Sequence, residues 1–307
     1  MIQQPTGCAQ AEARDASGDH RHTIFDLHPT PPSIRRRRYH RRRGPPPGPE
    51  AVIGVFDSGS GGLSVLVELR KLLPKMDLLY VADRARAPYG TRTLAEVEAM
   101  ALEVAEWLVG RGASTLVVAC NTASAAALDS IRARLPAIPV VGMEPAVKPA
   151  ASSTRSGVVA VLATSATFQG KLFATAVDRH ATAVEVHTRA CPQWVDLVEA
   201  GSVEGPQVET VVRRGVVPLI EVGADTLVLG CTHFSFLRPV IKRVAGPDVE
   251  VIDPAPAVAA QTARVTAETN GTGSLAFAVS GNLGDFAARV TALTDLGTPT
   301  RVLPFPA

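Results

Sequence analysis

The sequence contains few cysteines and no long apolar run. Four cysteines occur among 307 residues, and no Cys-x-x-Cys pair is present. This composition argues against a disulfide scaffold and a structural zinc site, so we predict free thiols in a reducing cytoplasm and no bound metal. No stretch approaches the ~18 uncharged apolar residues of a membrane span, and the first residues lack the apolar segment of a secretory signal. We therefore predict no membrane partner.

Two frequent nucleotide-binding motifs are missing as well. The run SGSGG at 58–62 has the composition of a phosphate loop. However, the sequence contains neither G-x-x-x-x-G-K followed by Ser or Thr nor G-x-G-x-x-G, which leaves nucleotide binding with little support. The backbone N–H groups of a glycine-rich loop would also suit a carboxylate.

The basic residues gather at the beginning of the chain. Residues 1–50 hold nine Arg and five Asp or Glu, a net charge of +4, which leaves −2 for the rest. This segment contains RRRRYHRRR followed by GPPPGPE, so we predict a disordered Arg/Pro-rich extension. A translation start further along the chain would also explain it. The alternative is an arm that binds nucleic acid, and we expect a nucleic-acid partner only through this segment.

From residue 51 onward, short apolar strands alternate with segments of helical periodicity. This alternation is typical of parallel sheets with helices on both faces. The rhythm occurs twice, and it predicts an α/β fold of two similar lobes with the active site in the cleft between them. The predicted strands are 51–56, 78–82, 115–119, 138–142, 157–163, 183–188, 226–230 and 249–253; the predicted helices are 63–73, 93–112, 123–135, 167–177, about 208–222 and one through 244.

Two nine-residue stretches repeat one pattern, STLVVACNT at 114–122 and DTLVLGCTH at 225–233. In each, an apolar strand leads into a cysteine and then into polar residues. Ligands of open parallel sheets bind at the carboxyl ends of strands, where Asp57 and Ser58 also stand. A thiol at a helix N-terminus has a lowered pKa, so Cys120 and Cys231 are candidates for chemistry.

Each candidate also has a structural interpretation. A free cysteine after a strand is more often a small buried apolar residue than a nucleophile, and we assign Cys191 to that class. Asp57 could only cap its turn, and His233 could be an ordinary residue at a helix start. Two cysteines in matched junctions, one in each half, favour chemistry. A pair of thiols across a cleft suits inversion of a carbon acid, in which one removes a proton and the other delivers one.

Four motifs together resemble the glutamate racemases of the aspartate/glutamate racemase superfamily. They are GVFDSGSGGLSVL (54–66), ADRARAPYG (82–90), ACNTAS (119–124) and LGCTHF (229–234). The resemblance covers about residues 51–280. It implies racemisation of L-glutamate to D-glutamate for peptidoglycan, no cofactor (pyridoxal phosphate included) and a homodimer. It also implies a first lobe at 51–145, a second at 146–255 and a C-terminal segment, 256–307, that returns to the first.

The resemblance also implies roles for individual residues. Cys231 would act on L-glutamate and Cys120 on D-glutamate, and Asp57 and His233 would assist the neighbouring thiols. The implied substrate-binding residues are Asp57, Ser58, Tyr89, Gly90, Asn121, Thr122, Thr232 and His233, with Thr164 and Thr167 as looser matches.

The chain departs from the family pattern at a few positions. The family usually continues GCTHYPLL, whereas this chain has GCTHFSFL, so Phe234, Ser235 and Phe236 could change the start of the following helix. Ser60 stands where a small apolar residue is frequent. Two alternative functions stay open: a racemase of the same superfamily acting on aspartate or a hydantoin, and a nucleic-acid-binding protein with a racemase-like body.

Overall fold

The computed structural model describes residues 52–267 and 271–305. The predicted extension at 1–50 lies outside these residues. The strands are β1 (Val52–Asp57), β2 (Asp77–Ala82), β3 (Ala113–Val118), β4 (Val140–Gly142), β5 (Val158–Ala163), β6 (Glu185–Ala190), β7 (Thr226–Gly230), β8 (Glu250–Ile252), β9 (Leu275–Val279) and β10 (Val302–Pro304). The helices are α1 (Leu63–Leu72), α2 (Leu94–Gly110), α3 (Asn121–Arg134), α4 (Val147–Ser153), α5 (Ser165–Gln169), α6 (Lys171–His180), α7 (Pro192–Glu199), α8 (Pro206–Glu221), α9 (Phe234–Ala245), α10 (Ala255–Val265) and α11 (Leu283–Leu293).

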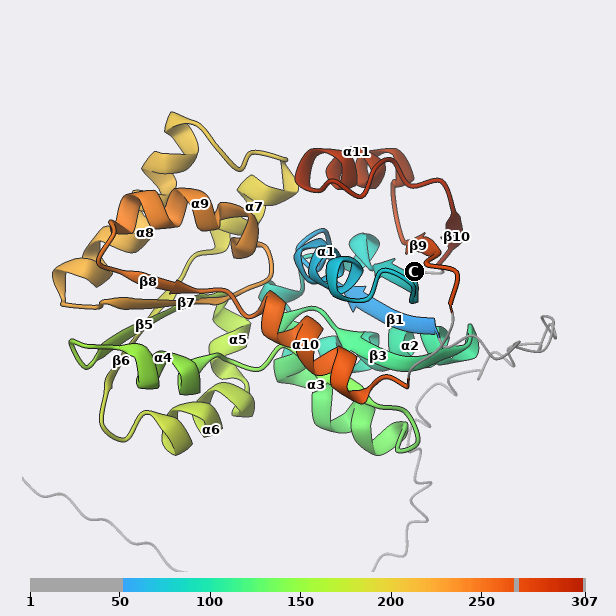
Figure 1. The fold of residues 1–307 in the computed structure, drawn as a ribbon, viewed down its shortest axis with the longest axis horizontal. Coiled ribbons are helices and arrows are strands. Elements are labelled where there is room, and N and C mark those ends of the chain that lie inside the picture. The colour runs from blue at the N-terminus through green and yellow to red at the C-terminus, as the bar shows by residue number, and fades with distance from the viewer. Residues whose placement is uncertain (1–51, 268–270, 306–307) are drawn as a thin grey trace, which may run out of the picture. The chain divides into compact units, whose positions relative to one another are not determined.

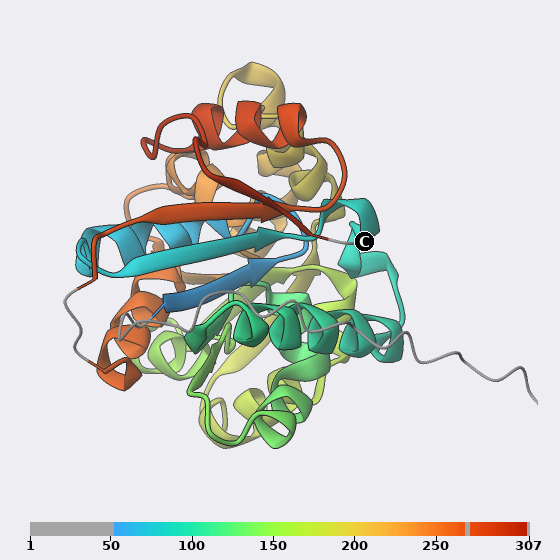
Figure 2. The same cartoon turned by 90° about the vertical axis from the view of Figure 1, so that its right-hand side faces the viewer.

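The strands form two sheets. Sheet A has the order β10-β9-β2-β1-β3-β4, and sheet B has the order β6-β5-β7-β8. All strand pairs in both sheets are parallel. In Figure 2 the arrows of β1, β2 and β9 point the same way. The predicted α/β fold class, with two parallel-sheet regions, is confirmed.

Sheet A is covered on both faces because its strands are apolar on both sides. Phe56 and Val118 point toward α2 and α3, where they join one buried cluster. Val55 and Val117 join a second cluster with α1, α10 and α11. Continuous burial of this kind is expected of parallel strands between two helical layers. Helix α2 begins with a capping box, in which Thr93 and Glu96 exchange hydrogen bonds, and this explains its start.

Sheet B follows the same principle with fewer strands. Leu162 and Leu229 pack under α7, α8 and α9, while Val161 and Val228 face α4 on the other side. Figure 1 shows these two helical layers on either side of sheet B. The edge strand β6 is largely exposed, which agrees with its polar sequence EVHTRA.

The structure differs from the sequence predictions in several places, and the elements that were not predicted are α4, α7, α10, α11, β9 and β10. The helix predicted at 167–177 is divided, because Gly170 is extended and a Cβ there would lie 2.5 Å from Ala125 Cβ of α3. Helix α7 was not predicted, although it begins with a proline at its first turn and buries Trp194 and Val198. Helix α9 begins at Phe234, so Thr232 and His233 form the turn that precedes it. The lobe limits at 145 and 255 stay predictions.

Candidate active site

Strands β1 and β3 are neighbours in sheet A, so their carboxyl ends bring Asp57, Ser58 and Cys120 together. The Ser58 Oγ lies 3.7 Å from the Cys120 Sγ. In sheet B, β7 ends at Gly230 and is followed directly by Cys231. Cys120 and Cys231 are both buried and unbridged.

The loop after β1 is organised around the Asp57 carboxylate. Its Oδ2 accepts hydrogen bonds from the backbone N–H groups of Gly59 (3.1 Å) and Gly62 (3.0 Å). Asp57 therefore does cap its own turn. Its Oδ1 is buried and has no hydrogen-bond partner among the described residues. Burial raises the pKa of Asp57 above its ordinary value, although His233 and the two N–H groups oppose this.

Cys120 is the N-cap residue of α3. Its Sγ accepts a hydrogen bond from Ala123 N at 3.4 Å. Burial, followed by the charge of Asp57, raises the pKa of Cys120, and the Ala123 N–H and Ser58 only partly offset this. Our prediction of a lowered pKa was wrong for Cys120, because desolvation outweighs the helix terminus. A thiol with a raised pKa holds its proton at neutral pH, so Cys120 is suited to donate a proton.

Cys231 has different partners. Its Sγ lies 3.7 Å from His233 Nδ1, and His233 Nε2 lies 2.8 Å from Glu199 Oε1. Burial alone would lower the pKa of His233, but the hydrogen bonds to Cys231 and Glu199 raise it well above its ordinary value. The pKa of Glu199 falls to about 2, because His233 and Ser60 outweigh the effect of burial. The three side chains form a thiol–imidazole–carboxylate series.

Glu199 is a site residue that the sequence interpretation missed. It lies at the end of α7, and its carboxylate reaches the glycine loop after β1. The helical spacing of Trp194 and Val198 could have revealed α7. The contact itself spans 139 positions and leaves no local signal.

The remaining predicted residues gather around the two thiols. The hydroxyl Oγ1 of Thr164 lies 3.1 Å from Thr122 Oγ1 and 3.0 Å from Thr167 Oγ1, and these hydrogen bonds link the start of α3 to α5. A Cβ on Gly90 would contact Thr164 at 3.3 Å. The hydroxyl of Tyr89 donates a hydrogen bond to the buried carboxylate of Asp83, so this hydroxyl is engaged within the protein rather than free to bind a ligand.

Asn121 carries the clearest mark of a binding site. Its side chain is buried, yet neither its Oδ1 nor its Nδ2 has a hydrogen-bond partner among the described residues. Asp57 Oδ1 is in the same state, and buried polar atoms without partners are rare unless a ligand or water completes them. Thr232 is also buried, and its carbonyl accepts from Ser64 Oγ at 3.2 Å. Residues 52–267 and 271–305 hold no group of three or more His, Cys, Asp or Glu suited to a metal.

Known proteins share both the sequence and the fold. The profile of the Asp/Glu/Hydantoin racemase family matches residues 53–262. The chain is 53% identical over 216 residues to a protein named glutamate racemase from Roseiflexus sp., covering 70% of this chain and 79% of that protein. It resembles the crystal structure of a glutamate racemase isoform from Bacillus anthracis with a TM-score of 0.76 and 33% identity, covering 83% and 97% of the two chains.

The chain belongs to the Asp/Glu/Hydantoin racemase family. The resemblance predicted from four motifs is thus confirmed. Another similar structure is the glutamate racemase from Francisella tularensis, described as a complex with D-glutamate, with a TM-score of 0.72, 29% identity and coverage of 84% and 98%. Within the described residues, no helix is both long and apolar enough to cross a membrane.

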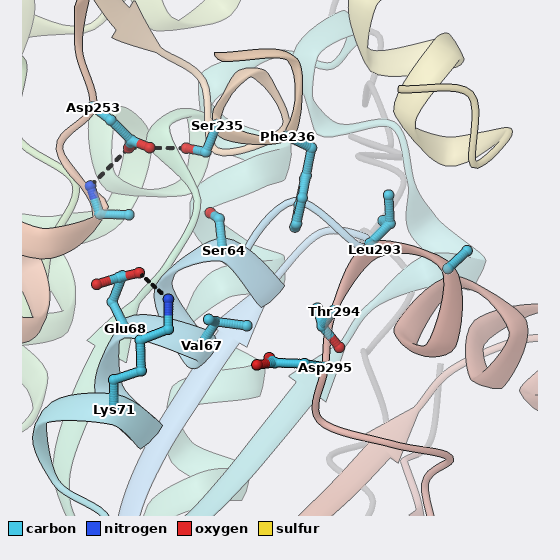
Figure 3. Close-up of a pocket in the computed structure, with 12 residues that line it drawn as sticks. Ser64, Val67, Glu68, Lys71, Ser235, Phe236, Asp253, Leu293, Thr294 and Asp295 are labelled. Carbon is cyan, nitrogen blue, oxygen red and sulfur yellow. Dashed lines mark hydrogen bonds and ion pairs between the residues drawn. The ribbon is translucent and has the colours of Figure 1, made fainter. Parts of the chain in front are cut away.

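Two of the departures from the racemase pattern, Ser235 and Phe236, line a cavity, whereas Phe234 lies in the buried cluster that contains Cys231. Phe234 is buried against Trp194, with ring centroids 4.8 Å apart. Ser235 donates to Asp253 Oδ1 at 2.9 Å, and Phe236 and Asp253 line a cavity of about 560 Å³ together with residues of α1 and α11 (Figure 3). Neither cysteine lines this cavity, so Ser235 and Phe236 alter its wall, whereas Phe234 packs beside Cys231 and its backbone N–H donates to the Cys231 carbonyl at 3.0 Å.

Proposed function

We propose that this racemase interconverts L- and D-glutamate without a cofactor, by proton transfer to and from Cys120 and Cys231. The observation that carries the proposal is the placement of one buried thiol after β3 and one after β7, where Cys231 lies beside His233 and Cys120 lies beside Ser58, in the loop that Asp57 organises. The names of the relatives and the D-glutamate complex favour glutamate as the substrate.

In the L-to-D direction, the Cys231 thiolate takes the α-proton, so that the C–H bond breaks and an S–H bond forms. The electron pair stays on the planar α-carbon and its carboxylate. The Cys120 thiol then donates its proton to the opposite face, which leaves D-glutamate and a Cys120 thiolate. The reverse reaction starts from that state, so no net proton is gained or lost.

The neighbouring groups prepare the two thiols. Protonated His233, held by Glu199, stabilises the Cys231 thiolate by hydrogen bonding and charge. Asp57 has a raised pKa and interacts with Cys120 by charge, so it suits proton exchange with that thiol. We assign the free atoms of Asn121 and Asp57 to the substrate's charged groups. Ser58, Thr122, Thr164, Thr167, Thr232 and the Tyr89–Gly90 turn complete the proposed pocket.

The test is a circular dichroism assay of purified protein with L-glutamate and no added cofactor. We expect the signal to decay to zero as the racemate forms, and aspartate to react at least tenfold more slowly. Faster turnover of aspartate or a hydantoin would move the protein to another branch of the family. A stable signal with every substrate would contradict the proposal.

The cellular role proposed for the product is peptidoglycan synthesis in the cytoplasm, by a homodimer. Growth of a D-glutamate auxotroph on a plasmid that carries this gene would support that role. Sedimentation would test the dimer.

A further inference from the structure

Ser60 lies in the glycine loop after β1, and its side chain is fully buried. Its backbone N–H donates to Glu199 Oε1 at 2.7 Å, and its Oγ donates to Glu199 Oε2 at 3.2 Å. One residue therefore holds both oxygens of one carboxylate. The backbone contact is available to any residue except proline, whereas the second contact requires a hydroxyl.

The Glu199 carboxylate also orients His233, the imidazole beside Cys231. Glu199 Oε1 is shared between the Ser60 N–H and His233 Nε2, so rotation of the carboxylate would break or lengthen both contacts. Apart from Ser60 Oγ, Oε2 has Arg84 at 3.6 Å, a distance longer than a direct hydrogen bond. The Ser60 hydroxyl is therefore the group that fixes the carboxylate plane.

We propose that the Ser60 hydroxyl is a positioning group for the Cys231 half of the reaction, acting through Glu199 and His233. This inference rests on the proposed two-thiol racemisation. The direct contacts of Ser60 are on one side, because the hydrogen-bond contacts of Cys120 are made by Ser58 and Ala123 and do not include Ser60. Loss of the hydroxyl lets the Glu199 carboxylate turn, and His233 then holds the Cys231 thiolate less well.

The test uses Ser60→Ala, which removes the hydroxyl without adding volume, and the isosteric pair Ser60→Thr and Ser60→Val. The two enantiomers have equal free energies, so kcat/KM falls equally in both directions. We expect a fall of about 3- to 13-fold in Ser60→Ala and Ser60→Val, the upper part of the range for one ordinary hydrogen bond. Ser60→Thr keeps the hydroxyl and should stay at least threefold more active than Ser60→Val.

The deciding readout is the primary isotope effect with α-deuterated substrates. When the Cys231 step is slowed, its isotope effect is expressed more fully with L-glutamate, whereas the Cys120 step limits the rate less with D-glutamate. We expect the effect in Ser60→Ala to rise for the L enantiomer and to fall for the D enantiomer, relative to wild type. A general loss of folding would lower activity without this opposite movement.

The outcomes separate this inference from the function on which it rests. A wild-type enzyme that does not racemise glutamate would contradict the proposed function itself. A racemising wild type with unchanged isotope effects in Ser60→Ala, or equal shifts for both enantiomers, would overturn the role of Ser60 alone.

Discussion

Sheets A and B contain the same four-strand arrangement. The order β2-β1-β3-β4 in sheet A corresponds to β6-β5-β7-β8 in sheet B, so β3 and β7 hold equivalent positions. The sequences STLVVAC and DTLVLGC are therefore the same segment of a repeated structural unit. Sheet A differs by the two further strands β9 and β10, which the C-terminal part of the chain supplies.

The two units differ most in what surrounds the cysteine. Cys120 has a hydroxyl, a backbone N–H and a carboxylate of raised pKa nearby. Cys231 has an imidazole of raised pKa that is held by a carboxylate. The repeat thus places two equivalent thiols, and the loops around them give each its own acid–base partner. The proposed proton transfer at two faces of one carbon requires this division, because one thiol must begin as a thiolate and the other as a thiol.

The largest effect is expected from removing either thiol. Cys120→Ala or Cys231→Ala should each lower racemisation by about 10³-fold or more, since one proton transfer then has no partner. Cys191→Ala is the matched control, because Cys191 is equally buried but packs in the core beside Trp194. Racemisation is measured by circular dichroism. Near wild-type turnover by either of the first two variants would exclude the two-thiol mechanism.

The next largest effect concerns the contact between the glycine loop and the Cys231 turn. A Cβ on Gly61 would lie 2.6 Å from Thr232 Oγ1 and 2.7 Å from His233 Cε1. Gly61→Ala must displace His233, so we expect kcat to fall by roughly 10²-fold, as for a misplaced catalytic group.

Gly110→Ala is the control, because nothing lies within 4 Å of a Cβ at that position in α2. This change should leave kcat intact and raise the free energy of unfolding by about 0.5–1 kcal/mol. A fully active Gly61→Ala variant would mean that the loop and His233 move apart without consequence.

A smaller effect is expected at Glu199. Glu199→Gln keeps the shape but weakens the hold on His233, and we expect kcat to fall roughly tenfold. The pKa of Glu199 lies near 2 in the folded state, below its ordinary value of 4.5. Its contribution to stability is therefore fully present above about pH 5 and is lost as the pH falls through 2.

Urea unfolding of wild type and Glu199→Gln checks this pH dependence. The difference in unfolding free energy should be about 1–3 kcal/mol at pH 6 and should shrink toward pH 3. For His233, whose pKa is raised, the sign is opposite: its contribution is present below pH 6.5 and is lost at alkaline pH. A wild-type advantage over Glu199→Gln that grows on acidification would contradict the ion pair.

The smallest effect concerns the link between β9 and the Tyr89 turn. Ser280 is buried, its Oγ donates to Asp83 Oδ1 at 2.8 Å, and it accepts from Ala85 N at 3.0 Å. Ser280→Ala should lower the unfolding free energy by about 1–2 kcal/mol and raise KM less than fivefold. Thr291→Ala, an exposed change on α11, is the control and should leave both the unfolding free energy and KM unchanged. Identical melting curves for the two variants would contradict the stabilising contribution of the Ser280 hydrogen bonds.

Sequence patterns predicted the elements whose formation depends on neighbours in the chain. Apolar strands such as β1 and the capped helix α2 carry local signals, and the motif resemblance identified both thiols and their family. The elements of the C-terminal segment, α10, α11, β9 and β10, were not predicted, although α11 has a local signal in its N-cap Asn282. Other features escaped prediction because they depend on contacts across the fold. Gly170 interrupts a helix because α3 lies against it, and Glu199 joins the site through a loop from the other sheet. The direction of the Cys120 pKa shift follows from burial, which no spacing of residues reveals.

The most direct test of the two-faced arrangement is early deuterium incorporation from D₂O, starting from L-glutamate at low conversion. If Cys231 removes the proton and a different group, Cys120, returns a solvent-derived one, the D-glutamate formed should carry deuterium at Cα. The remaining L-glutamate should still carry protium. Product that retains the original proton, or equal labelling of both enantiomers from the first turnovers, would mean that a single base serves both faces.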